Sequence, residues 1–376
     1  MTDGTADPPA EEGSAVVEPG AIPVWSWFGS DERSLVGITT LAVVLFPWVL
    51  VRAPVVSNVL DGYQSLTSLI LIWGIFALGF NLLLGYVGLL SFGHAVFWGG
   101  AAYAAGIFSA QVSGSPILVV LFGTLFAVVL SVMLGVITLR RSGIYFSILT
   151  LAFGQMAFHL AVSPLSGLTN GENGFTNVAV GNLFGFLDLF GPTESVPLST
   201  PLPVIGDWMY LFVGTITVLT VVAIARILHS PYGLVFKAIR ENEQRAEFVG
   251  LNVWRYKLMA FVLSGAFAGT AGSLFVVQGG YVPIQSLDWT TSGEIVVMTV
   301  LGGAGSMVGP MLGAGIYIYV ENVVSGYAVV QPYWHLILGL VFVVVVVLFP
   351  DGIWGIPGTV REKLSDSPGG ERGGEN

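Results

Sequence analysis

The chain has 376 residues, of which 54% are hydrophobic and only 10% charged, and its mean hydropathy is +0.82. The surface of a water-soluble domain carries about 25% charged residues, so this composition excludes a soluble protein and predicts a polytopic membrane protein. The chain contains no cysteine, which excludes disulfides, thiol catalysis and cysteine-ligated metals.

The net charge of -10 arises largely in two terminal tails. Residues 1–34 and 357–376 are rich in acidic residues, Gly, Pro and Ser. Such segments bury too little apolar surface to fold, so we expect both tails to be disordered. No basic segment precedes the first apolar run, and we therefore expect no cleaved signal peptide. The transmembrane domain is predicted over residues 35–356.

Apolar runs that resemble membrane-spanning helices, which need about 20 residues each, fill that domain and predict an all-α protein. With a cytoplasmic N-terminus, ten spans place twelve of the thirteen Lys and Arg on one side, and the positive-inside rule assigns that side to the cytoplasm. Both termini are then cytoplasmic, and so is the loop 230–257, whereas the loop 163–207 lies outside. The predicted spans are 35–52, 64–86, 90–111, 116–139, 143–162, 208–228, 258–278, 292–302, 306–325 and 334–350.

The loop 230–257 is the longest charged interruption of these apolar runs, and it holds five of the thirteen Lys and Arg. Ser230 followed by Pro231 is typical of a helix start, and Gly250 of a left-handed helix stop. The sequence therefore predicts one helix over 231–249, lying in water.

This predicted helix is amphipathic. Lys237 with Glu241, and Glu241 with Arg245, are opposite charges four residues apart, and each such pair stabilises a solvated helix by about 0.2–0.5 kcal/mol. The other face is apolar, so we expect it to rest against the membrane domain or a partner. The residues of that face are Val235, Ile239, Ala246 and Val249.

The predicted span 292–302 is too short to cross a bilayer, because eleven helical residues rise only about 16 Å. We expect a broken helix that ends at Gly302, Gly303 and Gly305. Interrupted helices are where transporters often hold their substrate, since unwound backbone groups can bind cargo or water. A longer helix that begins near Leu287 is the alternative.

Small residues at four-residue spacing predict where helices pack closely, because they let two backbones approach in lipid. Gly305, Gly309 and Gly313 form one such series, and Gly265 with Gly269 forms another.

Nothing in the sequence indicates a metal site, a cofactor, a nucleotide site or a nucleic-acid partner. The four histidines lie without the H-E-x-x-H pattern, and no Walker A motif is present. A membrane-embedded enzyme would need converging acid, base or metal groups, and the sequence offers no such cluster. A secondary transporter or channel, which would work without an ATPase, stays an alternative, although no carboxylate is evident at mid-membrane depth.

Several blocks of the chain resemble a known family. NLLLGYVGLLSFGHAVFWGGAAYAAG from Asn81 to Gly106 is similar to the signature of branched-chain amino acid ABC importer permeases, and SGIYFSILTLAFGQM, LTNGENGF and VLGGAGSMVGPMLGA match further family blocks in order. The likeness covers roughly residues 35–356. It is closer to the LivM-type subunit than to the shorter LivH-type partner.

The resemblance implies an integral membrane subunit that lies in the lipid bilayer of the cell membrane and works with several partner proteins. These are a LivH-like permease, two ATP-binding cassette subunits and an extracytoplasmic solute-binding protein. Leucine, isoleucine and valine are the implied cargo, and urea or short amides are the alternative. ATP hydrolysis is then expected in a separate chain, so this subunit is no enzyme.

The resemblance also assigns the ATPase-coupling segment, in which Glu243, Ala246 and Gly250 form the pattern E-x-x-A-x-x-x-G, with Arg240 and Glu241 at its start. A small residue and a glycine let a short helix sit deep in a cleft of a partner. We expect the helix 231–249 to act as a rigid lever on the sixth and seventh spans.

The residues expected to line the translocation path lie in two glycine-rich segments. Ser91 and His94 begin the predicted span 90–111, and His94 fits a packing role equally well. Gly302, Gly303 and Ser306 lie at the predicted break.

Overall fold

The regular structure of the chain is helical, as the composition predicts. The computed structural model describes residues 30–47, 64–184, 188–189, 208–322, 331–348 and 352–353. The C-terminal tail and all but the last residues of the N-terminal tail lie outside these ranges, so their disorder stays a prediction. The first helix, α1 (Ser30–Pro47), begins inside the segment expected to be disordered.

Five helices among the described residues are long and apolar enough to cross a membrane, with 19 to 27 residues each. They coincide with five of the predicted spans, because uninterrupted apolar sequence without Pro in its interior favours a helix that satisfies its own backbone in lipid. They are α2 (Gln64–Asn81) with its π-helical continuation η3 (Leu82–Val87), α4 (Pro116–Thr138), α5 (Ile144–Val162), α7 (Trp208–His229) and α10 (Val253–Gly279).

Each of the other five predicted spans contains a helix of 14 to 18 residues. A helix of 14 residues rises about 21 Å, less than the roughly 30 Å of a bilayer core. Besides α1, these helices are α3 (Ala95–Gln111), α11 (Trp289–Gly302), α12 (Gly309–Asn322) and α13 (Trp334–Leu348).

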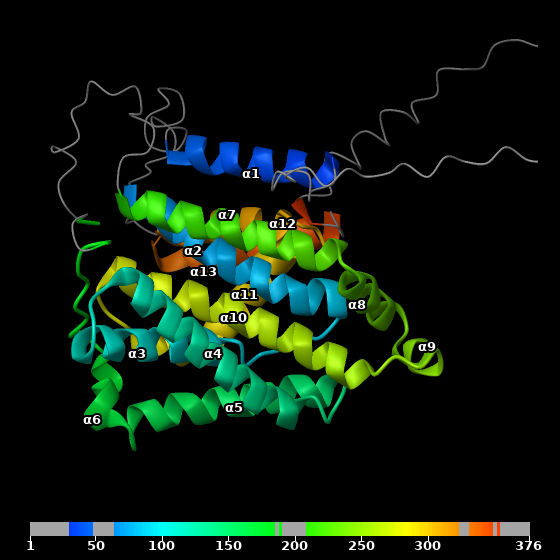
Figure 1. Cartoon of the computed structure of the whole chain (residues 1–376), viewed down its shortest axis with the longest axis horizontal. Helices are drawn as coiled ribbons and strands as arrows, with labels where there is room; N and C mark the ends of the chain where they lie inside the picture. Colours follow the sequence, from blue (N-terminus) through cyan, green and yellow to red (C-terminus); the bar gives the residue numbers. More distant parts are fainter. Residues whose placement is uncertain are drawn as a thin grey trace, which may run out of the picture.

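Helix α10 lies in the middle of the bundle and packs against α2, α3 and α4 (Figure 1). Small residues allow this close approach. A Cβ atom added at Gly269 would collide with Ala127 of α4, and one added at Gly272 would collide with the backbone of Trp98 in α3. The predicted packing role of Gly265 and Gly269 is confirmed.

Helices α4 and α5 turn most of their apolar side chains away from the rest of the bundle.

One end of the bundle is closed by short elements that join distant parts of the chain. They are α6 (Ser166–Thr169), η4 (Gly171–Asn173) and η6 (Ile284–Leu287). An isolated antiparallel bridge joins Phe175 to Val282, so the LTNGENGF block packs beside the segment that leads into α11.

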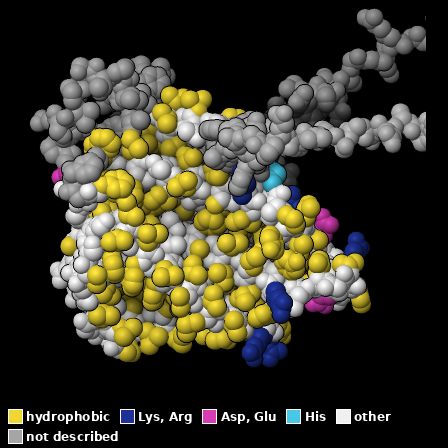
Figure 2. Space-filling model, in the orientation of Figure 1, with side chains coloured by type: hydrophobic (Ala, Val, Ile, Leu, Met, Phe, Trp, Pro, Cys, Tyr) yellow, Lys and Arg dark blue, Asp and Glu magenta, His cyan; other side chains and the backbone are white. Residues whose placement is uncertain are grey.

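The opposite end of the bundle carries the basic side chains. Figure 2 shows Lys and Arg gathered at the end where α8 (Pro231–Glu241) and α9 (Glu243–Phe248) lie, while hydrophobic side chains cover the adjoining flank. The turn between α4 and α5, the end of α7 and the start of α10 meet at this end (Figure 1). The Lys and Arg of these elements are Arg140, Arg141, Arg226, Lys237, Arg240, Arg245, Arg255 and Lys257.

The prediction of one continuous helix over 231–249 is wrong. Helix α8 ends at Glu241, and Asn242 adopts an extended conformation with φ −159°. Its side-chain oxygen then accepts a hydrogen bond from the Arg245 backbone N–H at 2.9 Å and begins α9. An Asn that caps the next helix competes with continuation of the previous one.

The break also changes which residues form the apolar face. Ile239 and Ala246 are buried as predicted, but Val249 is 73% exposed and Phe236, absent from the predicted stripe, is fully buried. Glu241 and Arg245 lie on different helices, so their predicted helical pairing is wrong. The predicted stop at Gly250 is confirmed by its φ of +87°.

The predicted end of the loop at residue 257 is wrong as well. Helix α10 begins at Val253, where Asn252 accepts a hydrogen bond from the Arg255 N–H at 3.2 Å. Lys257 is therefore part of the bundle and is buried.

We predict that Gly272→Ala lowers the thermal stability of the purified protein in detergent by about 1–3 kcal/mol, the usual cost of overpacking. The added methyl group would force α10 away from the Trp98 backbone. Gly293→Ala is the matched control, because no atom lies within 4 Å of its added Cβ, and it should leave the melting temperature unchanged or raise it. Equal melting temperatures for the two variants would contradict the packing described for α10.

Candidate translocation and coupling site

Two helices are interrupted inside the bundle. Helix α2 continues as η3, which ends at Gly88 with φ +80°, and the chain stays non-helical until α3 begins at Ala95. Helix α11 ends at Gly302, and residues 303–308 are non-helical before α12. The predicted break after Gly302 is confirmed. Helix α11 begins at Trp289, between the predicted start at residue 292 and the alternative start near Leu287. At the first break, the sequence predicted a connection over residues 87–89 but not that residues 90–94 stay non-helical, because 90–111 reads as one apolar run.

These two non-helical segments, residues 88–94 and 303–308, are called the paired breaks below. The φ angles of +111° at Gly303 and +92° at Gly305 lie in the region that only glycine adopts without strain. Glycine-rich sequence at both places is therefore required by the backbone path as well as by close packing.

The Asn81 side chain joins the end of α2 to the second break. Its Nδ2 donates to the Ser306 carbonyl at 2.8 Å, and its Oδ1 accepts from the Gly305 N–H at 2.8 Å. Asn81 itself is buried. One amide thus satisfies a backbone donor and a backbone acceptor that the interruption of α11 leaves free. Leaving these backbone groups without a hydrogen-bond partner in an apolar setting would destabilise the fold.

Close backbone packing between α11 and α12 also stabilises the second break, residues 303–308. A Cβ added at Gly302 would collide with the Gly309 carbonyl, and one at Gly313 would collide with Met298. The Ser306 hydroxyl donates to the Gly303 carbonyl at 2.7 Å. Gly309 and Gly313 have the predicted packing role. Gly305 also lies against the backbone of another element, because a Cβ added at Gly85 would lie 2.5 Å from the Gly305 N.

The predicted path residues lie on both of the paired breaks. Ser91 and His94 lie on the first, where both side chains are fully buried. Gly303 and Ser306 lie on the second, with Gly302 immediately before it. Their role in transport stays a prediction.

His94 lies in an aromatic cage between α2, α3 and α10. Its Nε2 is 2.7 Å from the Ser264 hydroxyl, and that hydroxyl donates to the Gly79 carbonyl at 2.7 Å, so Nε2 carries the proton and donates. The opposite ring nitrogen, Nδ1, has no partner within the described part of the chain. The rings around it belong to Phe76, Phe80, Phe97 and Phe261.

A further contact ties the first break to α11. The Ala95 N–H, at the start of α3, donates to the Ser292 hydroxyl at 2.8 Å, and both groups are buried. Sequence reasoning missed Asn81, Ser264 and Ser292. Each of them appears in the sequence only as a polar residue inside an apolar run, and this pattern does not identify its hydrogen-bond partner.

The predicted coupling residues divide between two helices. Arg240 and Glu241 end α8, and Glu243 and Ala246 lie in α9. The Arg240 guanidinium does not simply face water, because its Nη1 donates to the Gly85 carbonyl in η3. Gly250 ends the pair, and no neighbouring atom lies within 4 Å of its added Cβ.

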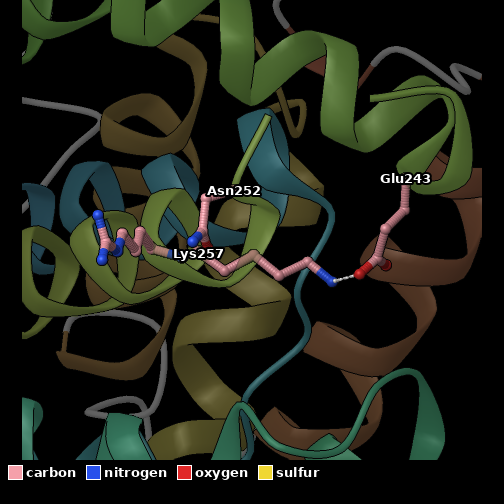
Figure 3. A network of polar contacts seen from close by, with 4 residues as sticks. Glu243, Asn252 and Lys257 are labelled. Atoms are coloured by element: carbon pink, nitrogen blue, oxygen red, sulfur yellow. Dashed lines mark hydrogen bonds and ion pairs between the residues drawn. The ribbon is translucent and has the colours of Figure 1, made fainter. Parts of the chain in front are cut away.

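The Glu243 side chain binds within the chain rather than lying free. Figure 3 shows Lys257 extended from α10 toward Glu243, and the Lys257 Nζ is 2.5 Å from Glu243 Oε1. The Lys257 side chain is 8% exposed and that of Glu243 is 42% exposed. The ion pair therefore fixes α9 near the start of α10, close to the Asn252 cap (Figure 3).

Within the described residues, no group of three or more His, Asp or Glu side chains could hold a metal ion.

The bundle of bilayer-length helices with paired breaks inside it is the architecture of a multi-pass membrane transport protein. Comparison with known proteins gives the family. The family model for the permease component of branched-chain amino acid transport systems matches residues 62–346. The chain therefore belongs to the branched-chain amino acid transport permeases, as the sequence motifs predict.

Similar curated proteins include the high-affinity branched-chain amino acid transport permease LivM of Escherichia coli, 29% identical over 86% of this chain and 76% of the relative. The LivM protein of Salmonella typhimurium is 28% identical over the same shares. A probable LivM of Methanocaldococcus jannaschii is 22% identical over 77% of this chain and 93% of that protein. No solved structure matches the chain.

We predict that Asn81→Leu destabilises the protein and lowers transport. The substitution leaves the Gly305 N–H and the Ser306 carbonyl without their partner, at a cost of about 1–3 kcal/mol for each buried group. Thermal unfolding in detergent checks the first effect. Thr215→Val is the control, because the exposed Thr215 hydroxyl donates to the Leu211 carbonyl in its own helix. A melting temperature for Asn81→Leu that equals the wild-type value would contradict the bridging role.

We also predict that Glu243→Lys weakens the attachment of α9, since it places a second ammonium group beside the buried Lys257. The charge-reversed double variant Glu243→Lys with Lys257→Glu should recover most of the lost thermal stability. A double-mutant cycle measures this coupling. Strictly additive effects of the two single substitutions would show that the ion pair contributes nothing.

Proposed function

We propose that the chain is the membrane-spanning permease subunit of an ATP-driven importer for branched-chain amino acids. The observation that carries the proposal is the extent of the family match, since residues 62–346 include both interrupted helices, the Asn81 bridge and the pair α8–α9. The printed names of its relatives describe branched-chain amino acid transport permeases.

The proposed topology has ten membrane segments in the cell membrane, with α11 and α12 too short to cross it fully. The basic end that holds α8 and α9 faces the cytoplasm, in line with the positive-inside rule. Both termini then lie in the cytoplasm, and the loop 163–207 lies outside.

The proposed partners are two ATP-binding cassette subunits at the cytoplasmic end, a LivH-like second permease and an extracytoplasmic solute-binding protein. Helix α9 protrudes from the bundle (Figure 1) and carries Phe248, which is 89% exposed. An exposed aromatic residue among charged side chains suits a partner cleft. The outward apolar side chains of α4 and α5 suit lipid or the second permease.

The proposed mechanism uses two short helices instead of one rigid lever. The ATPase subunits grip α9, and the ion pair of Glu243 with Lys257 carries this force to α10. Helix α8 lies against α7, α10 and η3, so it can act on the interrupted helices. Differential contacts in two states then switch the path, which includes Ser91, His94, Gly302, Gly303 and Ser306.

Uptake by the reconstituted assembly tests this function. We predict that proteoliposomes containing the chain with its partner permease, ATPase subunits and binding protein take up leucine only when ATP is supplied. Excess isoleucine or valine should compete, and excess urea should not. Uptake by this chain alone, without the ATPase subunits, would contradict an ATP-driven importer, and uptake of urea in place of leucine would contradict the cargo.

A further inference from the structure

One side chain of α8 reaches both interrupted helices. The Arg240 Nη1 donates to the Gly85 carbonyl in η3. A Cβ added at Gly88 would lie 3.2 Å from the Arg240 Cγ, and one added at Gly305 would lie 2.9 Å from Nη1. Arg240 therefore passes over the start of the first break and touches the second.

The chemistry at this point favours a cation. The continuous helix α2–η3 and the helix α11 both end here, and the C-terminus of a helix carries a partial negative charge. A guanidinium stays protonated at any physiological pH and offers five donors in one plane, so it can lie across two backbone segments. Gly88 and Gly305 have no side chain to keep it away, and both have positive φ.

Other contacts also connect the two interrupted helices. Asn81 joins α2 to Gly305 and Ser306. A force applied by Arg240 to Gly85 therefore also reaches the second break. The predicted coupling residue Glu243 is instead paired with Lys257 of α10.

We propose that Arg240 is a positioning residue that transmits movement of α8 to the paired breaks, instead of binding the ATPase. This inference rests on the proposed function as an ATP-coupled permease. It assigns docking to α9 and transmission to α8, with the joint between them at Asn242. Arg240 acts on the transport path through backbone groups and touches neither cargo nor nucleotide.

The test compares Arg240→Ala, Arg240→Lys and the control Lys237→Ala in the full reconstituted assembly. Lys237 lies one turn earlier on α8 and is exposed. Three quantities are measured: ATPase subunits retained on the purified chain, the rate of ATP hydrolysis, and leucine taken up per ATP hydrolysed. Hydrogen exchange of peptides covering residues 82–94 and 303–308 is measured in parallel.

For Arg240→Ala we expect retained ATPase binding, continued ATP hydrolysis and a loss of about tenfold or more in uptake per ATP, because a hydrogen bond to a charged group is removed. Exchange should rise in both peptides. Arg240→Lys should restore part of the uptake ratio by returning the charge. Lys237→Ala should change uptake per ATP by less than about twofold, the effect expected of an exposed surface charge.

Several results would overturn this role. Loss of ATPase binding in Arg240→Ala would make Arg240 a docking residue. An unchanged uptake per ATP, or unchanged hydrogen exchange, would show that Arg240 does not transmit movement of α8. Neither result would contradict the proposed function of the chain. If the unmodified assembly shows no ATP-dependent uptake, the proposed function fails and the inference fails with it.

Discussion

The structure depends on how interrupted helices satisfy their backbone groups in an apolar bundle. A free N–H or C=O in such a place costs several kcal/mol, and the non-helical segment 303–308 after α11 contains both kinds. The Asn81 amide supplies one partner of each kind, to Gly305 and Ser306. Because Asn81 ends α2, this solution also brings the two interrupted helices together. The same arrangement needs glycine at positions 88, 303 and 305, because the backbone there has positive φ.

The paired breaks lie beside α8 at the charged end of the bundle. Helix α8 rests on η3, and its Arg240 reaches the Gly85 carbonyl. Helix α9 is separated from α8 by the extended residue Asn242 and is held on α10 by the buried Lys257. The pair α8–α9 thus has two attachments to the bundle, one on the interrupted helices and one on the central helix α10. In the proposed mechanism, these two attachments are the points through which an ATPase subunit acts on the bundle.

Sequence reasoning predicted the long apolar helices, the break at Gly302 and the helix stop at Gly250, since each follows from local composition or from a glycine at a special backbone position. It failed where one residue outweighed a regular pattern. Asn242 fitted the helical spacing of 231–249 but caps a new helix, and residues 90–94 are apolar enough to join α3 yet stay unwound. The contacts of Asn81 and Arg240 could not be predicted, because they join residues 155 to 225 positions apart.

The most direct test of the account is the distance between α8 and the second break. The chain has no cysteine, so Lys237→Cys and Ala304→Cys give a unique pair of spin-label sites, and both positions are exposed. Pulsed electron paramagnetic resonance on the doubly labelled chain in lipid nanodiscs measures their separation. The account predicts a single, short and narrow distance distribution. A broad distribution, or a long distance that places α8 away from residues 303–308, would contradict it.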